Sequence, residues 1–294
     1  METISQINEV LGTQVEIKIP KSNNNLFFEC FKIAKEIEKK YSRFLEKNHL
    51  WNINKNIGKW QKIDLETLFL IQKAVEFKEK THGNFDITLK RVLDKMGYDN
   101  EYSFKEKETL ENEFQTNIEN PISINMEKEE IFLKKEIEFG GFGKGYFLDK
   151  AAEFFNKKGL DHYYINAGGD IFAKKGKGNE EWEILLEHPD NQNMAIGKVK
   201  LDNNAIAASA PNKRKWGKMH HLLNAKTKKP ASEVKAIFIM AKTGIEADAY
   251  ATALFGAGFN SAIEIANNLP IEMLIVSKEN KMYKTPDFEV EFFS

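Results

Sequence analysis

A carboxylate and a hydroxyl lie one helical turn apart in the segment EADAYAT. Asp248 and Thr252 occupy positions i and i+4 of this segment, and residues at that spacing share one face of a helix. Mg²⁺ binds to few protein oxygens and completes its coordination with substrate phosphates and water. The pair therefore indicates a possible magnesium site. The same pattern also fits an acidic residue in the first turn of a helix, where the helix dipole favours negative charge.

Two glycine-rich turns follow strand-like segments, EFGGFGKGY at residues 138–146 and NAGGD at residues 166–170. Glycine lets backbone N–H groups approach an anion, and a helix N-terminus adds partial positive charge. The first turn is not a phosphate-binding Walker loop, because position 138 is Glu and no Ser or Thr follows Lys144. Both turns are also explained as tight connections, with Asp170 as a turn former.

Two further segments carry polar or aromatic groups that could meet a ligand. GNFD at residues 83–86 offers Phe85 for stacking and Asp86 as an acceptor, although Phe85 also fits a core position. HHLLNAKTKKP at residues 220–230 reads as a strand running into a turn, and its histidine pair could equally lie on the surface. Cys30 is the single cysteine, so neither an intrachain disulfide nor a multi-cysteine metal site can form.

The composition is that of a globular chain with a sizeable core. Its 294 residues include 43 Lys and Arg against 44 Asp and Glu, and 41% are apolar. The net charge of −1 argues against nucleic acid as the main partner. No apolar run approaches the ~20 residues of a membrane helix, and METISQINEV lacks a signal-peptide pattern. The compartment stays open: periplasmic if a leader was removed, otherwise cytoplasmic.

Hydrophobic periodicity predicts the elements that must position these residues. The helices are expected at residues 26–41, 65–80, 145–157, 245–257 and 261–267. Residues 105–113 are charged and expected at the surface. Strands are expected at residues 10–19, 122–126, 130–133, 136–139, 163–166, 170–173, 181–187, 196–201, 205–208, 236–241, 272–276 and 289–293. Because the helices are grouped and do not alternate strictly with strands, we predict an α+β or mixed α/β fold, as one domain over residues 1–294.

Taken in order, these segments resemble the motifs of the ApbE family of flavin transferases. Glu138 stands where the family usually has Asp, Asn224 and Ala225 replace its Asp-Pro, and Lys228 replaces a glycine. The matching segments are LGTQVEIKI, YSRF, GNFDITLKRVLDKMGY, EFGGFGKGYFLDKAA, NAGGDI, HLLNAKTKKP and ADAYATALFGAG.

The resemblance implies a mixed α/β fold whose helices pack on one side of the strands. It also implies a Mg²⁺-dependent enzyme that cleaves FAD, attaches FMN to a Thr or Ser of an acceptor protein and releases AMP. Two alternatives remain, a Mg²⁺-dependent FAD pyrophosphatase and a flavin-binding protein without turnover. Neither nucleic acid nor a membrane is an expected partner, except for membrane association through the acceptor or a removed leader.

The resemblance also implies roles for individual residues. His221 would activate the acceptor hydroxyl or position phosphate, since histidine has an ordinary pKa of ~6.5. The expected Mg²⁺ ligands are Asp248, Thr252 and the backbone carbonyl of Gly141, with Asp248 also counted as catalytic. The expected FAD contacts are Asn84, Phe85, Asp86, Glu138, Lys144 and the backbone of Ala231.

Overall fold

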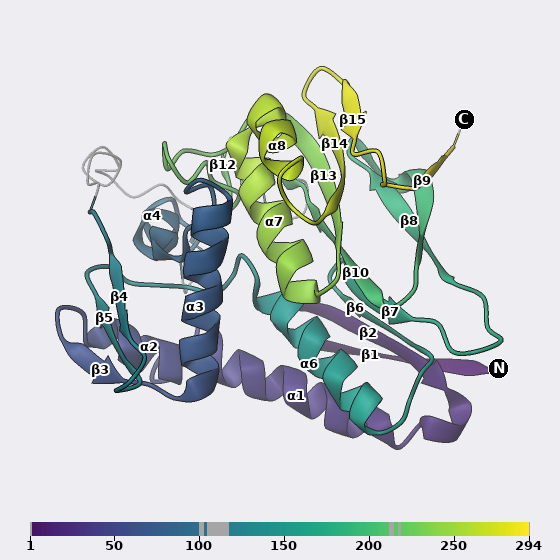
Figure 1. Cartoon of the computed structure of the whole chain (residues 1–294), viewed down its shortest axis with the longest axis horizontal. Helices are drawn as coiled ribbons and strands as arrows, with labels where there is room; N and C mark the ends of the chain where they lie inside the picture. The colour runs from purple at the N-terminus through teal and green to yellow at the C-terminus, as the bar shows by residue number, and fades with distance from the viewer. Residues whose placement is uncertain (1, 100–102, 105–117, 212–214, 217–218, 294) are drawn as a thin grey trace.

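An eight-stranded antiparallel sheet forms the centre of the protein (Figure 1). The computed structural model describes residues 2–99, 103–104, 118–211, 215–216 and 219–293. The strand order is β1-β2-β6-β7-β10-β13-β14-β15. The bounds are β1 Thr3–Val10, β2 Thr13–Pro20, β6 Tyr163–Ala167, β7 Asp170–Lys174, β10 Asn204–Ser209, β13 Val234–Ala241, β14 Glu272–Ser277 and β15 Met282–Lys284.

Both faces of this sheet are covered, by helices on one side and by a small sheet on the other. Along β13, Ile237 and Ile239 join the core shared with α1 (Leu26–Tyr41), α6 (Gly143–Lys157) and α7 (Gly244–Ala257). Phe238 and Met240 alternate with them and join the core under β8 (Trp182–His188) and β9 (Asn191–Leu201). Successive strand residues point to opposite faces, so a strand buried on both sides is apolar throughout.

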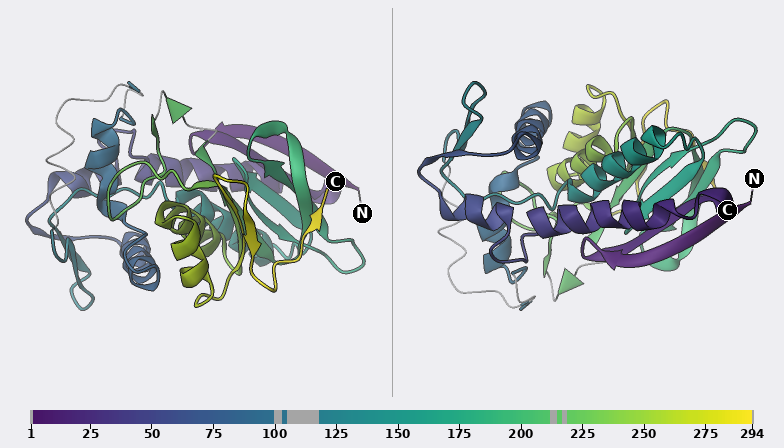
Figure 2. Two further views of the ribbon diagram at one scale, coloured as in Figure 1. Left: turned by 90° about the horizontal axis from the view of Figure 1, so that it is seen from above. Right: turned by 90° about the horizontal axis from the view of Figure 1, so that it is seen from below.

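The remaining elements form a second region at one end of the molecule and several short connections (Figure 2). That region combines α2 (His49–Lys55), α3 (Leu65–Lys80), α4 (Lys90–Lys95) and a three-stranded sheet ordered β3-β5-β4. The other bounds are β3 Trp60–Lys62, β4 Ile122–Asn125, β5 Glu130–Leu133, η1 Lys21–Asn23, η2 Ile87–Leu89, β11 Lys215–Trp216, β12 Met219–His220, α8 Phe259–Ala266 and β16 Glu291–Phe292. No helix within the described ranges is long and apolar enough to cross a membrane.

Most of the predicted elements are present, three of them with the predicted bounds, α1, α3 and β5. The strand predicted at residues 10–19 is present as β2, but its predicted start was wrong, because Leu11 and Gly12 have positive φ angles and form a hairpin turn between β1 and β2. The strand predicted at residues 136–139 was also wrong. The side chain of Asn54 bonds both the N–H and the C=O of Ile137, at 2.9 Å each, and so takes the place of a strand partner. Residues 105–113 lie outside the described ranges.

Helices α6 and α7 cross at very short range, through glycines. A Cβ atom on Gly145 would lie 2.1 Å from the carbonyl oxygen of Gly244, and one on Gly244 would lie 2.5 Å from the carbonyl oxygen of Gly145. The carboxylate of Asp149 accepts bonds from the N–H groups of Gly244 (2.5 Å) and Ile245 (3.0 Å), which fixes the start of α7 against α6. One turn after Gly244, Asp248 therefore faces the first turn of α6.

The crossing predicts that two glycine substitutions in the first turn of α6 differ in their effect on stability. Gly145→Ala puts a methyl group into backbone atoms, and overpacking of this kind costs about 1–3 kcal/mol. Gly143→Ala is the matched control, because a Cβ there meets no atom within 4 Å. We expect urea unfolding to show a loss of about 2 kcal/mol for Gly145→Ala and a change within about 0.5 kcal/mol for Gly143→Ala. Equal effects of the two substitutions would contradict the close crossing.

Candidate active site

The ammonium group of Lys144 lies between two buried carboxylates that come from different elements. Lys144, in the first turn of α6, forms an ion pair with Asp170 at the start of β7. Its Nζ also lies 3.3 Å from Oδ1 and 3.4 Å from Oδ2 of Asp248 on α7. The two aspartates are 2% and 4% exposed. Charged groups are buried in this way only when paired and hydrogen-bonded.

Backbone N–H groups complete this cluster. Gly145 donates to Oδ2 of Asp248 at 2.9 Å, a bond that depends on the close helix crossing. Ala208 on β10 donates to Oδ1 of Asp170 at 3.2 Å. Burial raises the pKa of the Asp170 carboxyl from its ordinary value of 3.8 to about 6, while Lys144 lowers it and the charge of Asp248 raises it further. The sequence indicated Asp170 as a turn former or a site residue, but it could not reveal Lys144 as its partner.

The other two predicted metal ligands lie against each other beside this cluster. A Cβ atom on Gly141 would lie 3.3 Å from the methyl carbon of Thr252 and 3.2 Å from the ring of Phe85. Thr252 follows Asp248 by one turn of α7. The Thr252 hydroxyl is carried by the same Cβ atom as this methyl group, and threonine in a helix uses two χ1 rotamers. A carboxylate, a hydroxyl and a carbonyl are the hard oxygen donors that Mg²⁺ takes, so these residues fit the ion.

Glu138 is buried next to an arginine to which the sequence assigned no role. Its Oε2 accepts a bond from the N–H of Gly140 at 2.7 Å and lies 4.0 Å from Nη1 of Arg43. Burial raises the pKa of Glu138, and the Arg43 charge opposes that effect. Arg43 also bonds Asp94 (2.5 Å) and the carbonyl of Tyr98 (3.1 Å). The sequence feature that could have identified Arg43 as a site residue is its position in the YSRF segment, which resembles a family motif.

The GNFD segment lies in a loop whose side chains bond within the protein. The Asn84 amide donates to the carbonyl of Thr81 at 2.8 Å. The Phe85 ring is 2% exposed and packs against other core phenylalanines. Asp86 accepts bonds from Thr88 and forms an ion pair with Lys78 at 2.7 Å. The side chain of Phe85 is thus a core ring, and it lies against Gly141 of the expected metal site.

The two neighbouring histidines occupy different surroundings. His220 is buried, and its Nε2 lies 2.8 Å from the carbonyl oxygen of Ala231. The His221 ring packs against Tyr98, with ring centroids 5.8 Å apart. Asn224 accepts a bond from the N–H of Thr227 and donates to the carbonyl of Gly256 on α7, both at 2.8 Å. An aspartate could not donate that second bond, so Asn224 ties its turn to α7.

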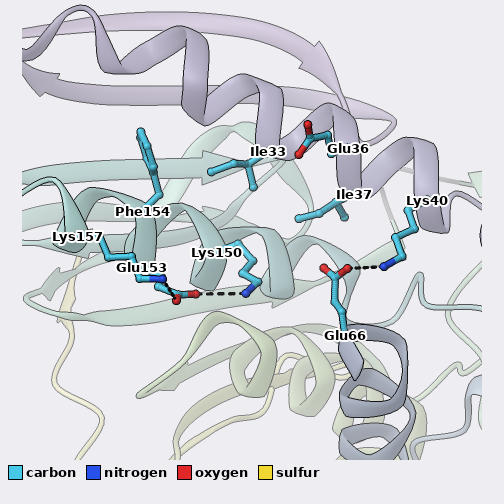
Figure 3. A pocket seen from close by; sticks show the side chains of 9 residues that line it. All are labelled: Ile33, Glu36, Ile37, Lys40, Glu66, Lys150, Glu153, Phe154 and Lys157. Carbon is cyan, nitrogen blue, oxygen red and sulfur yellow. Dashed lines mark hydrogen bonds and ion pairs between the residues drawn. The ribbon is translucent and has the colours of Figure 1, made fainter. Parts of the chain in front are cut away.

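Two cavities among the described residues lie away from the Lys144 cluster. One of about 440 Å³ lies between α1 and α6 (Figure 3). Most of its charged side chains are paired with one another, Lys40 with Glu66, and Glu153 with Lys150 and Lys157. The other, of about 640 Å³, lies along α3, α6 and the start of α7. Neither is lined by Lys144, Asp170 or Asp248. We place the candidate site at that cluster, because buried charges and backbone donors converge there.

Comparison with known proteins identifies the family. The sequence model of the ApbE family matches residues 11–275. The chain belongs to the ApbE family. A relative from Buchnera aphidicola subsp. Baizongia pistaciae, called FAD:protein FMN transferase, is 23% identical over 98% of this chain and 91% of its own length. A Haemophilus influenzae protein of the same name is 24% identical over 96% of this chain and 91% of its own length.

Solved structures show the same fold. The crystal structure of the ApbE protein of Thermotoga maritima aligns with a TM-score of 0.90 and 25% identity, over 98% of both chains. The flavin transferase ApbE of Vibrio cholerae aligns with a TM-score of 0.84 and 20% identity, also over 98% of both chains. The family resemblance and the mixed α+β fold predicted from the sequence are therefore confirmed.

The raised pKa of Asp170 predicts a pH dependence of stability. Between about pH 4 and pH 6 the folded protein keeps a proton on Asp170 that the unfolded chain has lost, so stability should fall as the pH rises. Asp170→Asn removes this titration. We expect the free energy of unfolding of the wild type, measured by urea in EDTA, to fall relative to that of the variant across this window. A difference that stays constant, or grows in favour of the wild type, would contradict the assignment.

Proposed function

We propose that the protein is a Mg²⁺-dependent FAD:protein FMN transferase. It would cleave the pyrophosphate of FAD, attach FMN through a phosphoester to a Thr or Ser of an acceptor protein, and release AMP. The observation that supports this most directly is the convergence of Lys144, Asp170 and Asp248 at the first turn of α6, beside Gly141 and Thr252. The relatives called FAD:protein FMN transferase support the same transfer.

The residues of the candidate site would each make a different contact with the charged pyrophosphate of FAD. Asp248, Thr252 and the Gly141 carbonyl would hold Mg²⁺, which when bound neutralises negative charge that develops on phosphate oxygens. The Lys144 ammonium and the N-terminus of α6 would position the phosphates, since the start of a helix carries N–H donors and partial positive charge. FAD would contact Glu138 and the GNFD loop on the other side of Gly141.

The transfer step needs an acceptor for one proton. The hydroxyl oxygen of the acceptor protein forms a bond to the phosphorus of the FMN half, and the bond from that phosphorus to the bridging oxygen breaks. The bridging oxygen leaves with AMP, and the hydroxyl proton goes to His221 in this proposal. His221 packs on Tyr98, whose ring also faces the guanidinium of Arg43 at 5.3 Å. Arg43 in turn faces Glu138.

Asp248→Asn should abolish most of the transfer while preserving the fold, because it weakens the only carboxylate in the proposed ligand set. We expect at least about a 100-fold lower rate, since altering even the residues behind a metal ligand costs 10–100-fold. The assay incubates protein, FAD, Mg²⁺ and a flavin-accepting protein, and follows covalent flavin fluorescence on a denaturing gel. Asp190→Asn is the control, because Asp190 is half exposed and bonds only Lys235 among its described ion pairs.

Three results of this assay separate the candidate functions. Transfer that depends on Asp248 supports the proposal. AMP and free FMN produced without an acceptor would assign the protein as an FAD pyrophosphatase instead. FAD that binds tightly, in EDTA as well, and remains intact when Mg²⁺ and the acceptor are present would assign a flavin-binding protein without turnover. Transfer at the wild-type rate by Asp248→Asn would contradict the proposed metal ligand.

The adjacent histidines provide a matched pair of substitutions. His221→Asn should lower kcat for transfer by about 10²–10⁴-fold, the usual contribution of a general base, with little change in thermal stability. His220→Asn should lower thermal stability, because His220 is buried and bonded to the Ala231 carbonyl. Melting curves and transfer kinetics of the two variants test this. A His221→Asn enzyme with wild-type kcat would exclude His221 as the base.

A further inference from the structure

The buried cluster holds more negative than positive side-chain charge. Asp170 and Asp248 provide two carboxylates, and Lys144 provides one ammonium between them. We propose that Lys144 competes with the divalent metal for Asp248, and that Asp170 is a positioning residue that draws Lys144 away when the metal binds. This inference rests on the proposed function, because it assumes a metal at Asp248. It gives Asp170, which has no role in the expected ligand set, a specific task.

The competition follows from the contacts of the Asp248 carboxylate. Oδ2 accepts the N–H of Gly145 at 2.9 Å. Oδ1 lies 3.3 Å from Nζ of Lys144, which is also 3.4 Å from Oδ2. The ammonium therefore lies on the side of the carboxylate where a cation would bind. An ammonium and a divalent cation repel each other strongly in a buried site, so the metal favours a position of Lys144 farther from Asp248.

Asp170 offers that second position, and its own placement is rigid. It opens β7 directly after Gly168 and Gly169, which have φ angles of 68° and 105°. The N–H of Gly169 bonds the Asn166 side chain at 2.8 Å, and Oδ1 of Asp170 is held by Ala208. The other oxygen, Oδ2, pairs with Lys144. The NAGGD turn thus aims one carboxylate oxygen at the lysine, so Nζ can move away from Asp248 while it keeps its ion pair with Asp170.

A double-mutant cycle on metal affinity tests both halves of the proposal. Mn²⁺ alone is titrated into the full-length protein without FAD, and free Mn²⁺ is followed by electron paramagnetic resonance. Lys144→Met should tighten Mn²⁺ binding by about tenfold, because it removes the competing cation. Asp170→Asn should weaken binding by about tenfold, because among the described ion pairs of Lys144 the one with Asp248 then remains. Coupling between residues in contact is commonly of this size.

The double variant separates positioning from simple charge loss. In the Lys144→Met background, Asp170→Asn should change the affinity by less than about threefold, since there is no lysine left to redirect. An equal effect of Asp170→Asn in both backgrounds would overturn the positioning role. A Lys144→Met protein with unchanged or weaker Mn²⁺ binding would overturn the competition. Lys144 is a quarter exposed, so this variant stays informative even where Asp170→Asn fails to fold.

Two further variants distinguish this inference from the proposed metal site. Asp248→Asn should weaken Mn²⁺ binding, and Asp190→Asn should leave it unchanged. If wild type and Asp248→Asn bind Mn²⁺ equally, the metal site in the proposed function fails, and this inference fails with it. If Asp248→Asn weakens binding while the Lys144 and Asp170 variants match the wild type, only this inference fails.

Discussion

The near contact of two helix backbones is the constraint on which the candidate site depends. Only glycine at positions 145 and 244 allows α6 and α7 to approach so closely. That approach brings the N–H of Gly145 within 2.9 Å of the Asp248 carboxylate and places Lys144 beside it. Hydrogen bonds weaken steeply when their geometry is lost. A methyl group at either glycine would separate α6 from α7 and break the bond from the Gly145 N–H to Asp248.

The central sheet provides the third residue of the cluster, Asp170. Its strands β6 and β7 are joined by the Gly168-Gly169 turn, and Asp170 follows at the strand start. Both sheet faces are buried, one under helices and one under β8 and β9, which holds these strand ends in place. Three elements far apart in sequence therefore deliver one ammonium and two carboxylates to one point. Such a cluster is suited to multivalent charge, such as a metal–diphosphate pair.

The sequence was sufficient to predict features that depend on a local pattern of residues. The bounds of α1 and α3 followed from apolar spacing, and the family followed from the order of the motifs. It was insufficient where the pattern is absent or long-range. Strand β1 is exposed along most of its length, so it shows no apolar alternation. The contact of Arg43 with Glu138 and the replacement of a strand partner by Asn54 join residues some 80 to 95 positions apart, which no local periodicity encodes.

The most direct test of the account is the position of a metal ion in a crystal. Crystals grown with FAD and Mn²⁺ would be measured at the manganese absorption edge, where the anomalous signal locates the ion. The account predicts a peak within coordination distance of Asp248 and Thr252, next to the diphosphate, with the Lys144 ammonium paired to Asp170. A peak elsewhere, or Asp248 still paired to Lys144 with FAD bound far from it, would contradict the central claim.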